Sequence, residues 1–280
     1  MSVGFHGLIK NGIANSVKWC CESVGTNVLQ LFLKSPMSYS MINVSENDAN
    51  ACAAYVKDND VIFVSHGQYV INMSEPDESK RAKYLGCAVD DITTAARLGA
   101  IGSVFHVGKA CKVAKPDAII LMHQFMVDVI NRISPDSRFI LETAAGQGTE
   151  LCVTMEELGE FYRSFSDEQR QKIKICVDTA HIFAAGYDIG DTEKCIEFIE
   201  LFERTVGWDN VVVVHLNDSK VGCSSCKDRH ADIGKGMINE EGFRIFVNFI
   251  ASKNIPMVLE TPCGLSDKAS EIALVKSWLT

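Results

Sequence analysis

The sequence lacks the features that would direct a chain into a membrane or out of the cell. No apolar run approaches the roughly 18 residues that a bilayer-spanning helix needs. The opening stretch MSVGFHGLIKNG has neither the charged start nor the apolar segment of a secretion signal. The 11 cysteines are scattered instead of forming the dense pattern of a short disulfide-stapled domain. We therefore expect a soluble intracellular protein with free thiols.

Positive charge is also scarce. The chain carries 27 Lys and Arg against 36 Asp and Glu, which gives a formal net charge of −9. Bulk attraction to phosphate needs many cationic contacts, so a nucleic-acid partner would have to meet positive charge concentrated locally. Basic residues that follow predicted strand ends are the candidates for such a local patch. They are Lys34, Lys109, Lys112, Lys115, Lys220, Lys227, Arg229 and Lys235.

No Pro/Gly/Ser-rich linker or shift in composition divides the 280 residues, of which 47% are apolar. Short runs rich in β-branched and aromatic residues recur along the chain and are almost continuously apolar, as strands covered on both faces are. Helical patterns lie between them, for example at 46–58, 79–100 and 192–206. This alternation predicts an α/β protein, a single (β/α)8 TIM barrel over residues 1–280. The predicted strands are 3–7, 28–33, 61–67, 102–108, 138–145, 173–181, 211–218 and 257–262.

Imidazoles and carboxylates recur at the carboxyl ends of these strands. They are His66, His106, Glu142, Asp178, His215 and Glu260. Such side chains converge on one mouth of a barrel, where barrel enzymes place their chemistry. His181 follows three residues after Asp178, and Asp228 and His230 lie in the long irregular segment 219–236. We expect that segment to be a loop at the same mouth, because long loops are often functional.

Nine such groups in one place would force several carboxylates to take up protons unless cations lie among them. Mixed nitrogen and oxygen ligands suit zinc, with manganese or iron as alternatives. A lone His or Glu at a strand end is ordinarily structural, but five of the seven histidines occupy these positions. His6 and His123 are left over, and we expect His123 to be structural because it lies within a helical pattern. The joint pattern predicts a site for up to three metal ions.

The pair Cys223 and Cys226, in the sequence CSSC, is a weaker signal. A zinc knuckle needs a second pair at a defined spacing, and none follows. We interpret the pair as free thiols in a mobile loop, with a disulfide or an additional metal site as the alternatives.

Seven stretches resemble motifs of the endonuclease IV family of apurinic/apyrimidinic (AP) endonucleases, DNA-repair enzymes with a (β/α)8 barrel and three zinc ions. They are SHGQYVIN, VFHVGK, ETAAGQGTEL, CVDTAHIFAAGYD, HLNDSK, DRHADIGKG and VLETP. The resemblance covers almost the whole chain. It implies hydrolysis of the phosphodiester 5′ to an abasic site in double-stranded DNA. The products would be a 3′-hydroxyl and a 5′-deoxyribose phosphate, and blocked 3′ ends would also be trimmed.

The resemblance also implies a role for each strand-end residue. The ligands would form three sets, one for each ion: His66, His106 and Glu142; Glu142, Asp178, His215 and Glu260; His181, Asp228 and His230. Water or hydroxide between the first two ions would attack phosphorus in line, and the third ion would stabilise the leaving oxygen. Glu142 and Glu260 are the predicted catalytic residues. Glu142 would bridge two ions, and Glu260 would also orient or deprotonate the attacking water.

Loops at the mouth are expected to contact the DNA. Tyr69 matches the family residue that inserts into the duplex at the damaged site, and Gln147 and Arg229 match DNA-contacting positions. Lys34 and Met37 lie in LFLKSPMSYS, where bacterial members commonly carry an arginine in place of Met37. Methionine fills an unstacked gap but cannot hydrogen-bond a base or a phosphate. We expect a monomer that encloses duplex DNA at one face.

Two other functions fit parts of the pattern. The layout is also similar to sugar isomerases and epimerases of the xylose-isomerase-like barrels, which use a Glu, Asp, His, Glu metal set. Such an enzyme does not require His66 with His106, nor the set on His181, Asp228 and His230. A non-catalytic damage-binding or scaffold protein that keeps metals for stability would be expected to have lost a ligand. All nine are present in this chain.

Overall fold

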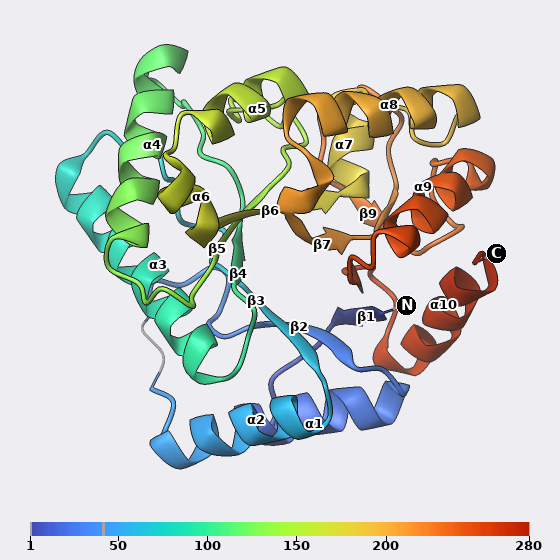
Figure 1. The fold of residues 1–280 in the computed structure, drawn as a ribbon, viewed down its shortest axis with the longest axis horizontal. Helices are drawn as coiled ribbons and strands as arrows, with labels where there is room; N and C mark the ends of the chain where they lie inside the picture. Colours follow the sequence, from blue (N-terminus) through green and yellow to red (C-terminus); the bar gives the residue numbers. More distant parts are fainter. Residues whose placement is uncertain (1, 41–42, 280) are drawn as a thin grey trace.

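The computed structural model describes residues 2–40 and 43–279 and shows a closed parallel barrel surrounded by helices (Figure 1). Within these residues, the strand order around the barrel is β1-β10-β7-β6-β5-β4-β3-β2, so β1 pairs with β10 to close the sheet. The TIM barrel predicted from the alternating pattern is confirmed. Its strands are β1 (Val3–His6), β2 (Val28–Phe32), β3 (Ile62–His66), β4 (Ser103–Phe105), β5 (Phe139–Glu142), β6 (Ile173–Asp178), β7 (Val211–His215) and β10 (Met257–Leu259).

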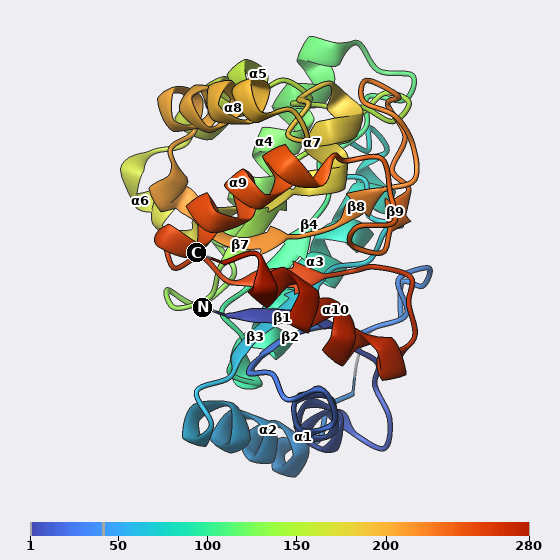
Figure 2. The same ribbon diagram turned by 90° about the vertical axis from the view of Figure 1, so that its right-hand side faces the viewer.

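Helices connect the strands and lie outside the barrel, as the two perpendicular views show (Figures 1 and 2). Within the described residues, none of them is long and apolar enough to cross a membrane. The helices are α1 (Ile13–Val24), α2 (Glu46–Asp58), α3 (Glu78–Arg97), α4 (Lys115–Ile130), α5 (Met155–Arg163), α6 (Asp167–Lys172), α7 (Thr179–Ala185), α8 (Thr192–Thr205), α9 (Glu240–Ser252) and α10 (Leu265–Ser277), with a 3-10 turn η1 (Trp208–Asn210) before β7.

Helix α8 illustrates why these segments become helices. The Asp191 side chain accepts a hydrogen bond from the Lys194 amide at 3.0 Å and so satisfies one of the free N–H groups of the first turn. Cys195, Phe198 and Phe202 recur at helical spacing and are buried, with both phenylalanine rings packed against Trp208. The other face is polar, which fits a helix with one side in water.

Two apolar cores lie on opposite sides of the strands. The larger one fills the space between the strands and the helices, and the smaller one fills the barrel interior. Alternate residues of a strand point to opposite faces, so every strand except β1, which has Gly4 at the interior position, contributes to both cores. The interior layer is formed by Val28, Val64, Val104, Ile140, Cys176, Val213 and Val258.

Several predicted strands end earlier than expected, and the predicted loop contains strand pairing. The strand expected over 173–181 ends at Asp178, because Asp178 caps helix α7 and accepts a hydrogen bond from the His181 amide at 2.8 Å. The segment 219–236, expected to be irregular, is framed by an antiparallel ribbon of β8 (Asp218–Ser219) and β9 (His230–Ala231). Hairpin pairing of two short strands carries no clear hydrophobic pattern, which is why the sequence did not reveal it.

Candidate metal centre

The strand-end residues form a polar layer directly above the apolar interior of the barrel. Each lies two positions after a member of the interior layer, as His66 follows Val64 and Glu142 follows Ile140. Residues two apart on a strand point to the same side, so all of these side chains enter the barrel mouth. The layer consists of Gln30, His66, His106, Glu142, Asp178, His215 and Glu260.

Glu142 occupies the middle of this layer and is only 1% exposed. Its Oε2 lies 3.1 Å from Nε2 of His106 and 3.6 Å from Nε2 of His66. Its Oε1 lies 2.8 Å from Nδ1 of His215 and 3.6 Å from Nδ1 of His181. The Glu142 carboxylate thus faces histidines of both strand-borne sets at once.

The side chains of each predicted ligand set lie close to one another. Potential ligand atoms lie within 4.8 Å of one another in the group His66, His106 and Glu142, and in the group Glu142, Asp178, His215 and Glu260. In the remaining set, Asp228 Oδ2 lies 3.3 Å from His181 Nε2, and Asp228 Oδ1 lies 3.1 Å from His230 Nε2. The structure therefore brings all nine predicted ligands into one region.

Hydrogen bonds behind the centre fix which ring nitrogen faces it. Nδ1 of His66 bonds the Gly67 carbonyl, and Nδ1 of His181 bonds the Thr143 carbonyl, both at 2.8 Å. Nε2 of His215 bonds Gln30 Oε1 at 2.8 Å and leaves Nδ1 turned toward the carboxylates. Histidines that bind metals are characteristically held in this way through their second nitrogen.

Several buried polar atoms at the centre form no hydrogen bond with any described residue. They are Nε2 of His66, His181 and His230, together with Oε2 of Glu142. Buried polar atoms nearly always find a hydrogen-bond partner, so four such atoms aimed into one region need an explanation. Imidazole nitrogen and carboxylate oxygen are the ligands that zinc takes. The residues present therefore fit divalent metal ions.

The groups of the centre also shift one another's proton affinity. Burial lowers the pKa of His230, but the negative charge of Asp178 and then the adjacent Asp228 carboxylate outweigh it and raise the pKa to about 9. Burial opposes ionisation of Glu142, yet neighbouring imidazoles, His106 first, hold its pKa well below the usual range. A cation that binds here must displace protons from imidazoles.

Four of the predicted DNA-contacting residues lie at the rim of the mouth. Tyr69 is 49% exposed, and its ring lies edge-on to His66 with centroids 5.5 Å apart. Met37 is 72% exposed. Gln147 and Arg229 line, with Tyr69, a pocket of about 470 Å³ beside the metal centre.

Lys34, the remaining residue expected to contact DNA, is buried and does not lie exposed at the rim. It is 6% exposed, and its Nζ lies 2.9 Å from Asp90 Oδ2 and 3.0 Å from the Cys87 carbonyl oxygen. The side chain turns outward from the end of β2 to helix α3 because both of these acceptors lie on that helix. Other expected basic charge is partly neutralised, since Lys109 pairs with Glu150 at 3.5 Å.

The remaining expectations concern cysteines and His123. All 11 cysteines are free, and of the CSSC pair Cys226 is exposed and Cys223 half-buried. The His123 ring stacks on Phe165 with centroids 4.3 Å apart, which is a packing contact away from the mouth.

Three residues of the centre were missed by sequence reasoning. Gln30 Nε2 donates to Glu260 Oε1 at 2.7 Å, and His6 Nδ1 lies 3.3 Å from the same oxygen. Asn217 Nδ2 donates to Asp178 Oδ2 at 2.7 Å, while its Oδ1 accepts from the Glu260 amide at 2.8 Å. The strand-end rule applied to VGFHG would have found His6. A glutamine inside the apolar run VLQLFL was the signal for Gln30.

The closed barrel places the chain among the xylose isomerase-like TIM barrels, and the model of that family matches residues 21–279. Within this class, the chain belongs to the endonuclease IV family. It is 35% identical over 265 residues to the "Probable endonuclease 4" of Haloquadratum walsbyi, covering 94% of this chain and 92% of that protein. The corresponding protein of Chloroflexus aurantiacus is 32% identical over 278 residues, covering 98% of this chain and 96% of the relative.

Solved structures agree with this placement. Endonuclease IV from Thermus thermophilus superimposes with a TM-score of 0.86 at 28% identity, covering 99% of this chain and 98% of that one. A D-tagatose 3-epimerase-like protein superimposes with a TM-score of 0.73 at 17% identity, covering 99% of this chain and 97% of that one. The second likeness shows the shared barrel fold alone.

Proposed function

We propose that this protein is a zinc-dependent DNA-repair endonuclease that hydrolyses the phosphodiester 5′ to an abasic site. The products are a 3′-hydroxyl and a 5′-deoxyribose phosphate, and blocked 3′ ends are trimmed as a second activity. The observation that carries the proposal is the gathering of nine imidazole and carboxylate side chains around the buried Glu142. Membership of the endonuclease IV family supports the reaction and the substrate.

Three zinc ions are proposed for the three ligand sets, with manganese as an alternative at one of them. When bound, such ions acidify a water molecule and offset charge on phosphate oxygens. The ligand sets are His66, His106 and Glu142; Glu142, Asp178, His215 and Glu260; His181, Asp228 and His230. Glu142 belongs to two sets and keeps them in a fixed relation. Its low pKa means that it offers an ionised carboxylate throughout the neutral range.

Glu260 is proposed to orient the attacking water or take its proton. The carboxylate is held from two sides, by Gln30 Nε2 at 2.7 Å on Oε1 and by His215 Nδ1 at 3.1 Å from Oε2. His6 Nδ1, at 3.3 Å from Oε1, gives a further partner that could receive or return a proton. A base must be placed before its pKa matters, and these contacts place it.

Double-stranded DNA is proposed to bind across the mouth, with this protein acting as a monomer. Tyr69 and Met37 protrude where a wedge between base pairs would stand, and their exposure leaves them free to unstack neighbouring bases. The pocket of about 470 Å³ lined by Gln147 and Arg229 would receive the displaced abasic sugar. Arg229 would supply a charged contact to phosphate.

The proposal is tested by zinc analysis of the gently purified protein together with nicking of a duplex that contains one tetrahydrofuran abasic analogue. About three zinc equivalents and a single cut on the 5′ side of the analogue are expected, with the undamaged duplex left intact. One ion or none, or no cut in the presence of zinc, would contradict the proposal.

The same preparation should be offered ketose and aldose sugars. The Glu142, Asp178, His215 and Glu260 group alone would suit a sugar isomerase or epimerase, but that reaction leaves His181, Asp228 and His230 without a purpose. Sugar turnover without DNA cleavage would favour that rival function.

A further inference from the structure

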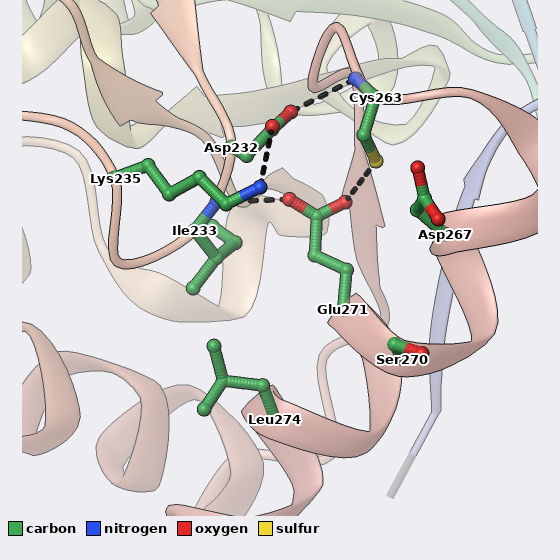
Figure 3. A pocket seen from close by; sticks show the side chains of 8 residues that line it. All are labelled: Asp232, Ile233, Lys235, Cys263, Asp267, Ser270, Glu271 and Leu274. Atoms are coloured by element: carbon green, nitrogen blue, oxygen red, sulfur yellow. Dashed lines mark hydrogen bonds and ion pairs between the residues drawn. The ribbon is translucent and has the colours of Figure 1, made fainter.

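The segment that follows β9 is held by Glu271 of helix α10 (Figure 3), which forms a buried ion pair with Lys268. Glu271 and Lys268 are both buried, and Lys268 Nζ lies 3.2 Å from Glu271 Oε2. Burying two charges costs much of the energy that their attraction returns, so such a pair contributes more to a particular geometry than to stability. The hydrogen bonds of Glu271 and Lys268 show which segments of the chain the pair holds together.

The two carboxylate oxygens of Glu271 bind different segments of the chain. Oε1 accepts a hydrogen bond from the backbone amide of Ile233 at 2.8 Å, in the segment that continues from β9. Oε2 accepts hydrogen bonds from the Thr261 hydroxyl and from the Cys263 thiol, the latter at 3.2 Å. Thr261 directly follows Glu260. One side chain thus joins the segment after β9 to the end of β10.

Further contacts reinforce this junction. Asp232 Oδ1 accepts from the Cys263 amide at 2.8 Å, and Asp232 Oδ2 accepts from Lys235 Nζ at 3.2 Å. Lys268 Nζ donates to the Thr261 carbonyl at 2.8 Å. Asp232, Lys235 and Cys263 line, together with Glu271, a pocket of about 270 Å³ between the segment and α10. Figure 3 shows Glu271 between the Ile233 amide and the Cys263 thiol.

The junction matters because it connects the loop ligands to the strand that ends in Glu260. Asp228 and His230 lie on or beside β9, which among the described residues pairs with β8 alone. The loop is also held to helix α7 by the amides of Ser224 and Cys226, and to Gln147 Oε1 by the Asp228 amide, but none of these contacts reaches Glu260. Another buried carboxylate, Asp218, organises the same segment by accepting from the amides of Gly236 at 2.9 Å and Ile238 at 3.1 Å. Asp218 folds the segment onto itself, whereas Glu271 fixes it relative to the strand that ends in Glu260.

We propose that Glu271, supported by Lys268, is a positioning residue that sets Asp228 and His230 at their working distance from Glu260. The inference rests on the proposed function, since it makes Glu271 responsible for the relation of the third ligand set to the other two. The carboxylate is needed because a glutamine oxygen can accept from Ile233, but its NH2 group cannot accept from the Thr261 hydroxyl.

The test compares Glu271→Gln with two variants on the same helix. Ile272→Val removes one buried methylene and weakens packing without removing a bond of Glu271. Asp267→Asn makes the same carboxylate-to-amide change at an exposed residue that lines the same pocket. Zinc content and hydrogen exchange are measured on the DNA-free protein, and kcat and KM on the abasic duplex.

Glu271→Gln is expected to keep about two of three zinc equivalents after brief exposure to a chelator. Exchange should become faster in peptides from 228–238 and from 261–268, where Thr261 and Lys268 lose the carboxylate, and stay unchanged in the other barrel strands. We expect kcat to fall about 10–100-fold, the order of loss that a small misplacement of catalytic groups causes, while KM stays within about twofold. Added zinc should restore kcat in part. Ile272→Val should lower Tm only, and Asp267→Asn should behave as the parent protein.

The proposal is overturned if Glu271→Gln keeps the zinc and kcat of Ile272→Val, or if exchange rises evenly along the chain. A parent protein that holds no zinc and cuts no abasic DNA would refute the proposed function instead. In that case the exchange in 228–238 still decides whether Glu271 holds the segment.

Discussion

The metal centre combines two regions that are built differently. His66, Glu142 and His215 end barrel strands, and their relative positions follow from the sheet register, in which Asp178 lies beside His215. Asp228 and His230 sit on a short ribbon outside the barrel, supported by side-chain hydrogen bonds. A hydrogen-bonded closed sheet resists distortion more than a segment held by a few side chains. The two ligand sets that share Glu142, here called the strand-borne sets, should therefore be the rigid part of the centre. The set that contains Asp228 and His230, here called the loop-borne set, should be the adjustable part.

The largest effect on nicking and on zinc content is expected from Glu142→Ala, which removes a ligand from the rigid part. Loss of the shared carboxylate should reduce nicking of the abasic duplex by at least about 10³-fold and remove more than one zinc equivalent, because two ligand sets depend on it. Single-turnover nicking and elemental analysis measure these effects. The matched control is Glu200→Ala, an exposed carboxylate on helix α8 that pairs with Arg204 outside the proposed site. Unchanged turnover in Glu142→Ala would show that the centre has been misassigned.

Asp228→Ala removes a ligand from the adjustable part and should have a smaller effect on zinc content and kcat. We expect loss of about one zinc equivalent, retention of the other ions, and a fall in kcat of about 10²-fold, because only the loop-borne set loses a ligand. Elemental analysis after gel filtration distinguishes the outcomes. Loss of all zinc would mean that the loop and strand sets are not independent, and the comparison between them would fail.

Acidification should release zinc from both parts. The raised pKa of His230, about 9, means that its imidazole holds a proton at neutral pH that zinc must displace. Zinc affinity should therefore strengthen as pH rises and weaken as pH falls, by about tenfold per pH unit for each proton displaced. Calorimetry in buffers of different ionisation enthalpy counts the released protons. Zinc binding without proton release would contradict the charge arrangement described for the centre.

The smallest effect is expected in DNA affinity, where a variant of Arg229 at the rim is compared with a variant of the buried Lys34. Arg229→Ala should weaken DNA binding and lower the slope of log affinity against log salt by about 1, as expected when one phosphate contact is lost. Lys34→Met should leave that slope unchanged and reduce thermal stability, because it breaks the buried contact with Asp90. Fluorescence anisotropy over a range of salt concentrations measures both. A reduced slope for Lys34→Met would mean that Lys34 leaves its buried position to reach DNA.

Much of the fold and centre followed from local patterns, and the errors have physical causes. The strand-end rule found His66 and His215 because strand period and barrel closure turn spacing into position. The same rule expected Lys34 in a basic patch at the mouth, where the structure does not expose it. The sequence around a lysine that follows a strand does not show whether its side chain reaches solvent or a buried acceptor such as Asp90. The rule missed Gln30 because a single polar residue in an apolar run has no periodic signal of its own.

The sequence by itself determined the barrel and the residue types at its mouth, because alternation within strands and repetition between them are local properties of the chain. The tertiary structure alone decided which nitrogen of His215 faces the carboxylates, where the Lys34 charge is buried, and that Glu271 joins the segment after β9 to the end of β10. Each of these contacts joins segments that are distant in sequence, and its geometry exists only once the strands have closed around the common centre.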